Sequence, residues 1–155
     1  MCIIVDPPLF VALFKKSDTR HETFSPVLQW VKDGKGKFVV GGSLYQSELG
    51  KVGTVLKPIQ ELEKKGKVVR RDKKKVDIQV EIVKTQEKSK DFDDPHLVAL
   101  VLESGCRLVC TSDDRAHKYL KDEKFFKKNN SVPSLFTNAS HKHLLCKSNI
   151  VNCCQ

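Results

Sequence analysis

The chain has 155 residues, of which 39% are hydrophobic and 30% charged, and it carries a net charge of +9. This composition excludes a disordered chain, and one domain of this length can bury a core without disulfide staples. No apolar run reaches the roughly 18 residues of a membrane span, and the first run is too short for a signal peptide.

These features predict a single cytoplasmic domain over residues 1–155, with a core at about 2–136 and a C-terminal tail at 137–155. Disulfides are rare in the cytoplasm, so the six cysteines are expected to be reduced thiols.

The first half of the chain alternates short apolar runs with longer amphipathic segments. Short apolar runs bounded by turn residues indicate buried strands, and serine or proline at the start of a periodic segment indicates a helix. Strands are predicted at Cys2–Asp6, Lys37–Gly41 and Lys67–Arg71. Helices are predicted at Leu9–Phe14, from Ser25-Pro26 to Gly34, after a capping Ser43, and at Ile59–Lys65.

Residues 76–83 fit two structures. Val76, Ile78, Val80 and Ile82 alternate as in a strand, whereas Val76, Val80 and Val83 also form one helical stripe. Taken locally, the alternation slightly favours a strand.

The second half contains a helix, a tight turn and a buried strand. Asp94 before Pro95 is typical of a helix start, and Gly105 of a helix end. The run Arg107–Cys110 reads as a strand buried on both faces. A helix at Asp114–Phe126, an edge strand near Ser134–Phe136 and a last helix at His141–Lys147 follow. Alternating strands and helices predict an α/β fold with a mostly parallel sheet.

Four acids occupy comparable places in this pattern. Asp6 and Asp113 follow strands, while Glu48 and Asp94 lie near the N-terminal ends of helices. In a parallel sheet all four face one edge, where α/β proteins bind ligands. Grouped carboxylates repel and raise each other's pKa unless a cation compensates them, and Mg²⁺ prefers such oxygen ligands.

Basic residues are concentrated in two runs. Residues 64–75 contain eight of them, and Lys121–Lys128 contains four more. Such runs are often only solvated faces, but the overall positive charge makes contact with a nucleic-acid backbone the alternative. The candidate contacts in the first run are Lys64, Lys65, Lys67, Arg70, Arg71 and Lys73.

Several of these segments resemble the PIN-domain nucleases. The matching pieces are Ile3–Asp6, the helical Glu48, the D-x-x-x-V-A-L pattern of Asp94–Leu100 with Ser104-Gly105, and Leu108–Asp113, which is similar to the family's apolar strand ending in T-x-D. The resemblance covers about residues 2–120 and implies a three-layer α/β/α sandwich. It also implies a helix at Lys73–Gln86, against the local alternation.

The resemblance further implies an endoribonuclease that uses Mg²⁺ or Mn²⁺. Its catalytic acids would be Asp6, Glu48, Asp94 and Asp113, with Asp6, Asp94 and Asp113 as metal ligands. Thr111 would orient Asp113, with Asp114 beside it. RNA is the expected substrate and DNA an alternative. Many relatives are toxins silenced by a protein partner or effectors of phage defence, so an inhibitory partner and a homodimer are compatible expectations.

Simpler readings and rival functions exist for each feature. Taken alone, Asp94 is equally well explained as an N-cap and Glu48 as a solvated helix residue. Asp113 and Asp114 alone could form a turn, and Asp93 or Asp114 could replace a neighbour as a metal ligand. Pro7-Pro8, where the family usually has a small polar residue, keeps open a non-catalytic nucleic-acid-binding or regulatory module. Phosphatase chemistry on small phosphate esters is a weaker option.

Histidines and C-terminal cysteines offer further candidates of lower rank. His96 and His117 are candidate substrate contacts, although ordinary surface or half-buried histidines are more common. The residues His141, His143, Cys146, Cys153 and Cys154 are zinc-type ligands, but their spacing fits no standard structural zinc pattern.

Overall fold

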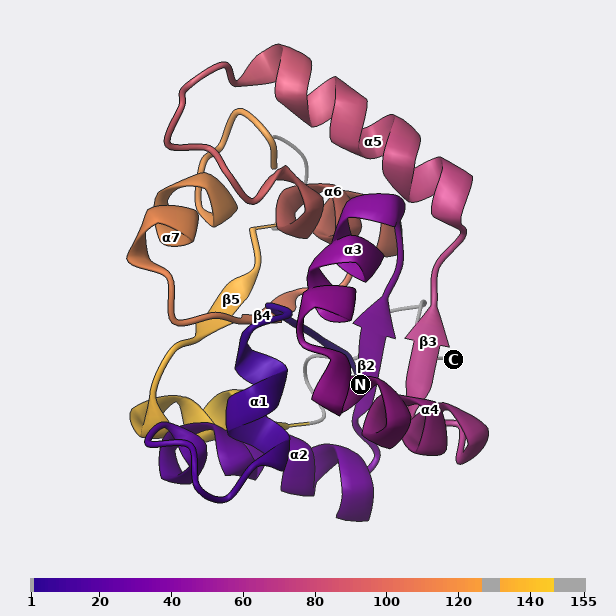
Figure 1. The fold of residues 1–155 in the computed structure, drawn as a ribbon. Coiled ribbons are helices and arrows are strands. Elements are labelled where there is room, and N and C mark those ends of the chain that lie inside the picture. Colours follow the sequence, from indigo (N-terminus) through magenta and orange to yellow (C-terminus); the bar gives the residue numbers. More distant parts are fainter. Residues whose placement is uncertain (1, 127–131, 147–155) are drawn as a thin grey trace.

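The computed structural model describes residues 2–126 and 132–146, and its centre is a sheet of five parallel strands (Figure 1). The strands are β1 (Cys2–Val5), β2 (Lys37–Val40), β3 (Val68–Arg70), β4 (Leu108–Cys110) and β5 (Ser134–Phe136). Their order in the sheet is β3-β2-β1-β4-β5. The predicted α/β fold is confirmed, and the parallel pairing extends to the edge strand β5.

Helices cover both faces of this sheet, as in a three-layer α/β/α sandwich. They are α1 (Leu9–Phe14), α2 (His21–Asp33), α3 (Ser43–Lys51), α4 (Leu56–Lys64), α5 (Lys73–Gln86), α6 (Pro95–Ser104) and α7 (Asp114–Leu120), with 3-10 turns η1 (Gly53–Val55) and η2 (Ala139–Leu144). The chain steps outward from β1 to β3 and then crosses back to β4. Because such crossovers are right-handed, the connections before and after β3 lie on opposite faces.

Strand β1 is the central strand, and all four of its residues are buried, as expected where helices cover both faces. Ile4 stands opposite Val39 of β2 and Val109 of β4, and Val5 stands opposite Cys110. The backbone N–H of Asp6 continues this ladder by donating to the carbonyl of Cys110 over 2.9 Å. The carboxyl ends of β1 and β4 therefore lie side by side, at the point where the strand order reverses and α/β sheets bind ligands.

Helix α3 is attached to the end of β1 by Tyr45. The tyrosine side chain is fully buried, and its hydroxyl donates to the carbonyl of Val5 over 2.5 Å. Its ring meets the edge of His96 on α6 with centroids 6.0 Å apart. The residue that precedes Asp6 is thus held by both a strand ladder and a helix.

The segment 73–86 is a helix, so the strand favoured by its local alternation is wrong and the helix implied by the PIN resemblance is correct. Val76, Val80 and Val83 are buried, whereas Ile78 is 62% exposed. Asp72 caps the helix by accepting a hydrogen bond from the N–H of Lys75. Tertiary packing of the valine stripe decides the structure here, and the isoleucines in the alternation face outward.

Several predicted helix boundaries are wrong. Helix α4 starts at Leu56 rather than Ile59 and contains Pro58, and the helix predicted from His141 is the 3-10 turn η2. Three further errors have a clear physical cause. Helix α2 begins at His21 and contains Pro26 in its interior, because Phe24 is buried against Phe136 and holds an additional turn. Helix α7 ends at Leu120, before a turn in which Asp122 accepts from the N–H of Lys124.

The third error concerns the start of α3. Ser43 does not cap it; the N–H and hydroxyl of Ser43 both donate to Asp77 of α5 over 2.6 Å. The preceding Gly42 has φ +84°, and an added Cβ would lie 2.5 Å from Val76. Helix α5 therefore supplies the carboxylate that caps α3, which a local sequence pattern does not reveal.

Among the cysteines that the structure describes, Cys2 differs from the expectation. Cys2 is disulfide-bonded, so the prediction that all six are reduced thiols is wrong. Cys106, Cys110 and Cys146 are thiols, as expected. Within the described ranges 2–126 and 132–146, none of the helices is both long enough and apolar enough to traverse a bilayer.

Candidate functional site

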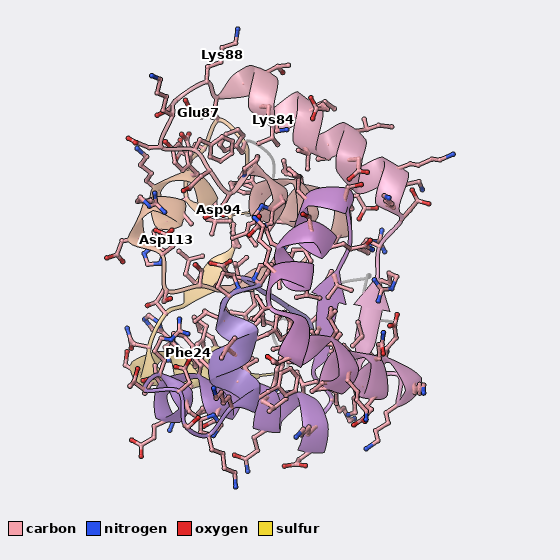
Figure 2. All side chains as sticks on the ribbon, viewed as in Figure 1. Phe24, Lys84, Glu87, Lys88, Asp94 and Asp113 are labelled. Carbon is pink, nitrogen blue, oxygen red and sulfur yellow. The ribbon has the colours of Figure 1, made fainter. Side chains whose placement is uncertain are left out.

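Four aspartates from three separate segments converge at the carboxyl ends of β1 and β4; they are called the acidic cluster below. Asp6 follows β1, Asp113 follows β4, and Asp93 and Asp94 precede α6. Asp93, Asp94 and Asp113 each offer a carboxylate oxygen within 4.8 Å of the others. In Figure 2, Asp94 and Asp113 lie close together between α6 and α7. Residues 2–126 and 132–146 contain no other group of three ligand-type side chains this close.

Asp6 is the most deeply buried member, with only 7% of its surface exposed. The hydroxyl of Thr111 donates to its Oδ2 over 2.9 Å. Burial raises the pKa of Asp6 to about 6; the Thr111 hydrogen bond lowers it, and the charges of Asp113, Glu48 and Asp93 raise it. The charged form of Asp6 is therefore destabilised by its position.

Asp94 is half-buried and makes no capping hydrogen bond to α6. Asp94 occupies the N-cap position of α6, but its carboxylate does not cap the helix, so the interpretation of this side chain as a capping group is wrong. Burial raises the pKa of Asp94 to about 7, and the neighbouring charges of Asp6, Asp93 and Asp113 raise it further. Its surroundings therefore favour the protonated form of Asp94 more than those of an ordinary exposed aspartate do.

Asp113 differs from these two because its charge is compensated. Its Oδ1 caps α7 by accepting from the backbone N–H of Arg115 over 2.9 Å, and the Arg115 guanidinium donates to both of its oxygens. The hydrogen bonds from Arg115 lower the pKa of Asp113.

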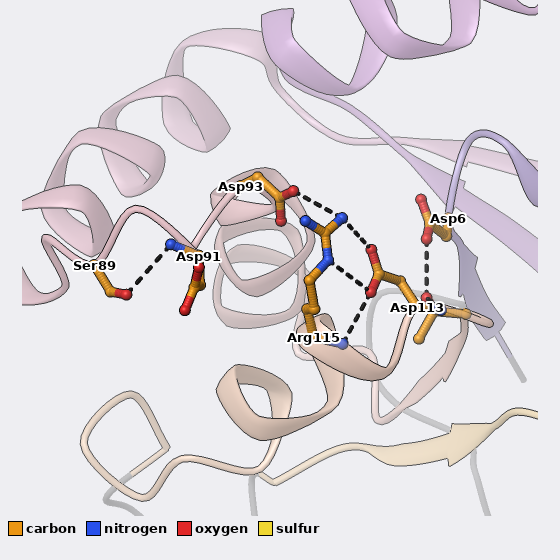
Figure 3. A network of polar contacts seen from close by, with 7 residues as sticks. Asp6, Ser89, Asp91, Asp93, Asp113 and Arg115 are labelled. Carbon is orange, nitrogen blue, oxygen red and sulfur yellow. Dashed lines mark hydrogen bonds and ion pairs between the residues drawn. The ribbon is translucent and has the colours of Figure 1, made fainter.

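Arg115 also reaches a second member of the cluster. Its Nη2 lies 3.0 Å from Oδ2 of Asp93 and 2.9 Å from Oδ2 of Asp113. Figure 3 shows the guanidinium between these two carboxylates, with Asp6 on the other side of Asp113. This pair of contacts is called the Arg115 bridge below.

Two further acids expected at the site lie less centrally. Glu48 sits on α3 and pairs with Lys51 over 2.6 Å, but it is near enough for its charge to raise the pKa of both Asp6 and His96. It is not among the three acids within 4.8 Å of one another. The side chain of Asp114 is 98% exposed and faces His117, at 3.4 Å, rather than the cluster.

His96 lies in the first turn of α6, close to Glu48 and Asp93, and is almost completely buried. Its Nε2 has no hydrogen-bond partner. Burial lowers the pKa of His96 to about 4, so the imidazole is neutral at physiological pH. Because His96 is buried and packs against Tyr45, it cannot contact a large substrate directly. His117 is half-buried on α7.

The basic run at residues 64–75 is divided between the amino end and the carboxyl end of strand β3. The residues before β3 lie at the amino ends of the strands, away from the acidic cluster; they are Lys64, Lys65 and Lys67. Of these, Lys67 donates to the carbonyl of Gly34. Arg70 pairs with Glu63 at 2.9 Å and Arg71 with Glu103 at 2.7 Å. Lys73 begins α5 and is exposed.

The second basic run is described only in part. Lys121 is exposed at the end of α7, and Lys124 pairs with Glu87 and Asp122. Lys127 and Lys128 lie outside the described residues. Helix α7 begins next to Asp113 and separates Lys121, which follows its C-terminal end, from the acidic cluster.

The C-terminal candidates are also described in part. His141 and His143 lie in η2, where Nδ1 of His141 accepts from the N–H of Thr137. Cys153, Cys154 and Lys147 lie outside the described residues. Within those that are described, this histidine pair does not form a group of three metal-type ligands.

Thr111 connects the two strand ends that carry Asp6 and Asp113. Besides donating to Asp6, its oxygen accepts from the N–H of Asp113 over 3.1 Å. Thr111→Val is expected to raise the pKa of Asp6 further and to lower the free energy of unfolding by about 2 kcal/mol, because a buried carboxylate and an N–H lose their partners. Carboxyl ¹³C NMR titration and urea unfolding measure both effects. Thr111→Ser, which keeps the hydroxyl, should resemble wild type; a normal pKa in Thr111→Val would contradict this role.

Two residues of the site are not predicted from sequence as primary members. Asp93 is predicted only as a substitute for a neighbour, because one acid in a run of acids carries no signal of its direction. Arg115 is not predicted at all. Its only signal is the D-x-R spacing, which also occurs at Asp18 and Arg20, where the guanidinium forms the same bonds at 2.9–3.0 Å.

Comparison with known proteins identifies no relative. No protein-family model matches this chain, no curated protein is similar to it at a significant level, and no solved structure matches its fold significantly.

Proposed function

We propose that this chain is a metal-dependent endoribonuclease that hydrolyses RNA phosphodiester bonds. One observation carries the proposal: carboxylates from residues 6, 93, 94 and 113 are gathered at the ligand-binding edge of a parallel sheet. Narrower roles, as a toxin held by an inhibitory partner or as an effector of phage defence, rest on the resemblance to PIN-domain nucleases alone.

The donor set suits a hard divalent cation. All members are carboxylates, and Mg²⁺ and Mn²⁺ favour such oxygen ligands. The pKa of Asp6 is raised to about 6 and that of Asp94 to about 7, so gathering these acids is costly without added positive charge. Asp94 and Asp113 are the candidate ligands common to the sequence-based set and to the closest group, which Asp93 completes.

A bound Mg²⁺ or Mn²⁺ would supply an activated water and neutralise charge at the phosphodiester. The chain's own residues do the positioning. Thr111 fixes the orientation of Asp6, and the cap on α7 fixes that of Asp113. In hydrolysis, the water oxygen bonds to phosphorus, the P–O ester bond breaks, and the leaving oxygen takes up a proton.

A basic protein attracts a polyanion, and the net charge of +9 supports a nucleic-acid substrate. Of the expected contacts in the first run, only Arg70, Arg71 and Lys73 lie at the edge that carries the acidic cluster. Two strand spacings separate β3 from β1, which is roughly 10 Å. A bound strand of RNA can therefore reach from these residues to the cluster.

A second candidate function, a nucleic-acid-binding module without turnover, is favoured by one observation. Arg115 already pairs with both Asp93 and Asp113, so one positive charge is present in the acidic cluster without an added ion. This alternative predicts salt-sensitive RNA binding and no cleavage.

Incubation of the purified protein with end-labelled structured RNA separates the two candidates. We expect cleavage with Mn²⁺ or Mg²⁺ and none with EDTA. RNA that is bound in a filter assay, with affinity falling as salt rises, but remains intact at all Mn²⁺ concentrations would favour the binding module. Labelled DNA in parallel tests the choice of nucleic acid.

A further inference from the structure

Arg115 occupies oxygens that a metal ion would need. Its Nη2 contacts Oδ2 of Asp93 at 3.0 Å and Oδ2 of Asp113 at 2.9 Å. These two acids are members of the group whose ligand oxygens lie within 4.8 Å of one another. A guanidinium and a dication therefore compete for the same carboxylates (Figure 3).

The Asp18–Arg20 pair shows which part of this arrangement is local. There too, an arginine two residues after an aspartate donates through its backbone N–H, Nε and Nη2. No second carboxylate is paired with Arg20 in the described chain. The additional contact of Arg115 with Asp93, which comes from the segment before α6, is specific to the acidic cluster.

The Arg115 bridge can open without disturbing the site around it. The guanidinium is exposed, and ion pairs of this kind are weak. The backbone N–H of Arg115 still caps Asp113 through Oδ1 at 2.9 Å when the side chain leaves. Asp113 thus keeps its position whether or not the bridge is formed.

We propose that Arg115 is a built-in competitor of the dication: the ion binds when the guanidinium releases Asp93 and Asp113, and the bridge occupies these acids when the ion is absent. The inference rests on the proposed metal-dependent function and adds to it a control of ion affinity. The chain thereby protects its acids from mutual repulsion at low ion concentration and exchanges arginine for metal as that concentration rises.

Calorimetric titration with Mn²⁺ alone tests the competition. Arg115→Gln is expected to tighten binding roughly three- to tenfold relative to wild type. Arg115→Lys keeps the charge but loses the planar fork, so its affinity should fall between the two. Arg20→Gln, the matched control at the Asp18 pair, should bind as wild type does.

Each result has a definite meaning. Wild-type binding with no gain in Arg115→Gln overturns the competition and leaves the proposed function standing. A gain in Arg115→Gln with Arg115→Lys equal to wild type assigns the effect to net charge and also overturns it. If neither wild type nor Arg115→Gln binds Mn²⁺, the proposed function and this inference both fail.

A measurement on the unaltered protein avoids dependence on how a variant folds. The Nε–Hε NMR signal of Arg115, assigned by its loss in Arg115→Lys, should shift during titration with Mg²⁺, while that of Arg20 stays fixed. An Arg115 signal that does not move at saturating Mg²⁺ would overturn the proposal.

Discussion

Asp94→Asn is expected to slow Mn²⁺-dependent RNA cleavage by about 10²–10³-fold. The substitution removes one negative charge from the centre of the acidic cluster while it keeps the size of the side chain. Metal ions contribute several kcal/mol of charge stabilisation, and each 1.36 kcal/mol corresponds to a factor of ten in rate. Since Asp94 makes no capping bond to α6, no helix cap is lost with it.

The measurement is the single-turnover rate with labelled RNA at saturating Mn²⁺. Asp18→Asn is the matched control, because Asp18 also pairs with an arginine two residues later but lies beyond α1, away from the acidic cluster. It should cleave at the wild-type rate. Equal rates for Asp94→Asn and wild type would remove the acidic cluster from the chemistry.

The free energy of unfolding is expected to fall by roughly 2–4 kcal/mol as the pH rises from about 4.5 to 7.5 in EDTA. Aspartate in an unfolded chain titrates at its ordinary pKa of 3.8, whereas the folded-state pKa is about 6 for Asp6 and about 7 for Asp94. Between these values the folded protein binds more protons than the unfolded chain does. The stability that protonation of these two acids contributes therefore decreases with rising pH across this window and is lost above about pH 7.

The opposite sign applies to carboxyls whose pKa is lowered, such as Asp18, Asp77 and Asp113. Their contribution is present above the unfolded pKa and is lost as the pH falls through the folded one. That loss occurs below about pH 4, outside this window. His96 also titrates within this window, because its folded pKa of about 4 lies below its ordinary value of 6.5. Its contribution to stability rises with pH, so the expected fall is the net of this gain and the larger loss from Asp6 and Asp94. Urea unfolding across this window measures the net change.

Comparison of Asp94→Asn with wild type isolates the contribution of Asp94 to the pH dependence of the free energy of unfolding. At about pH 7.5 the variant should be more stable than wild type by roughly 1–3 kcal/mol and its pH profile flatter, because an amide need not ionise. Added Mg²⁺ should stabilise wild type at this pH and the variant less. Parallel pH profiles for wild type and Asp94→Asn would show that Asp94 is not strained by its surroundings.

The fold was largely predictable, and the exceptions have physical reasons. Strands such as β1 and β4 are continuous apolar runs, the signal that a parallel strand buried on both faces produces. Helix α5 was misleading locally because Ile78 and Ile82 are exposed apolar residues that imitate alternation. The starts of α2 and α3 depend on Phe24 and Asp77, whose partners are distant in sequence.

Prediction of the candidate site was less complete. The places of Asp6, Asp94 and Asp113 follow from where strands end and helices begin, and the structure brings them to one edge. Which oxygens come closest depends on loop geometry, so Asp93 joins the closest group, whereas Asp6 and Glu48 stay outside it. Arg115 could not be predicted because a D-x-R turn is a local motif, whereas its second contact is made across the fold.

The hydrogen bond between Thr111 and Asp6 joins residues 105 positions apart. Contacts of such long range form only after the intervening chain has been made and its loop closed. On the ribosome, Asp6 therefore emerges well before any strand exists to complete its surroundings. No nascent fragment that ends before residue 113 contains all four carboxylates of the acidic cluster, so the cleavage proposed for this cluster would require that β4 has already been synthesised and paired with β1.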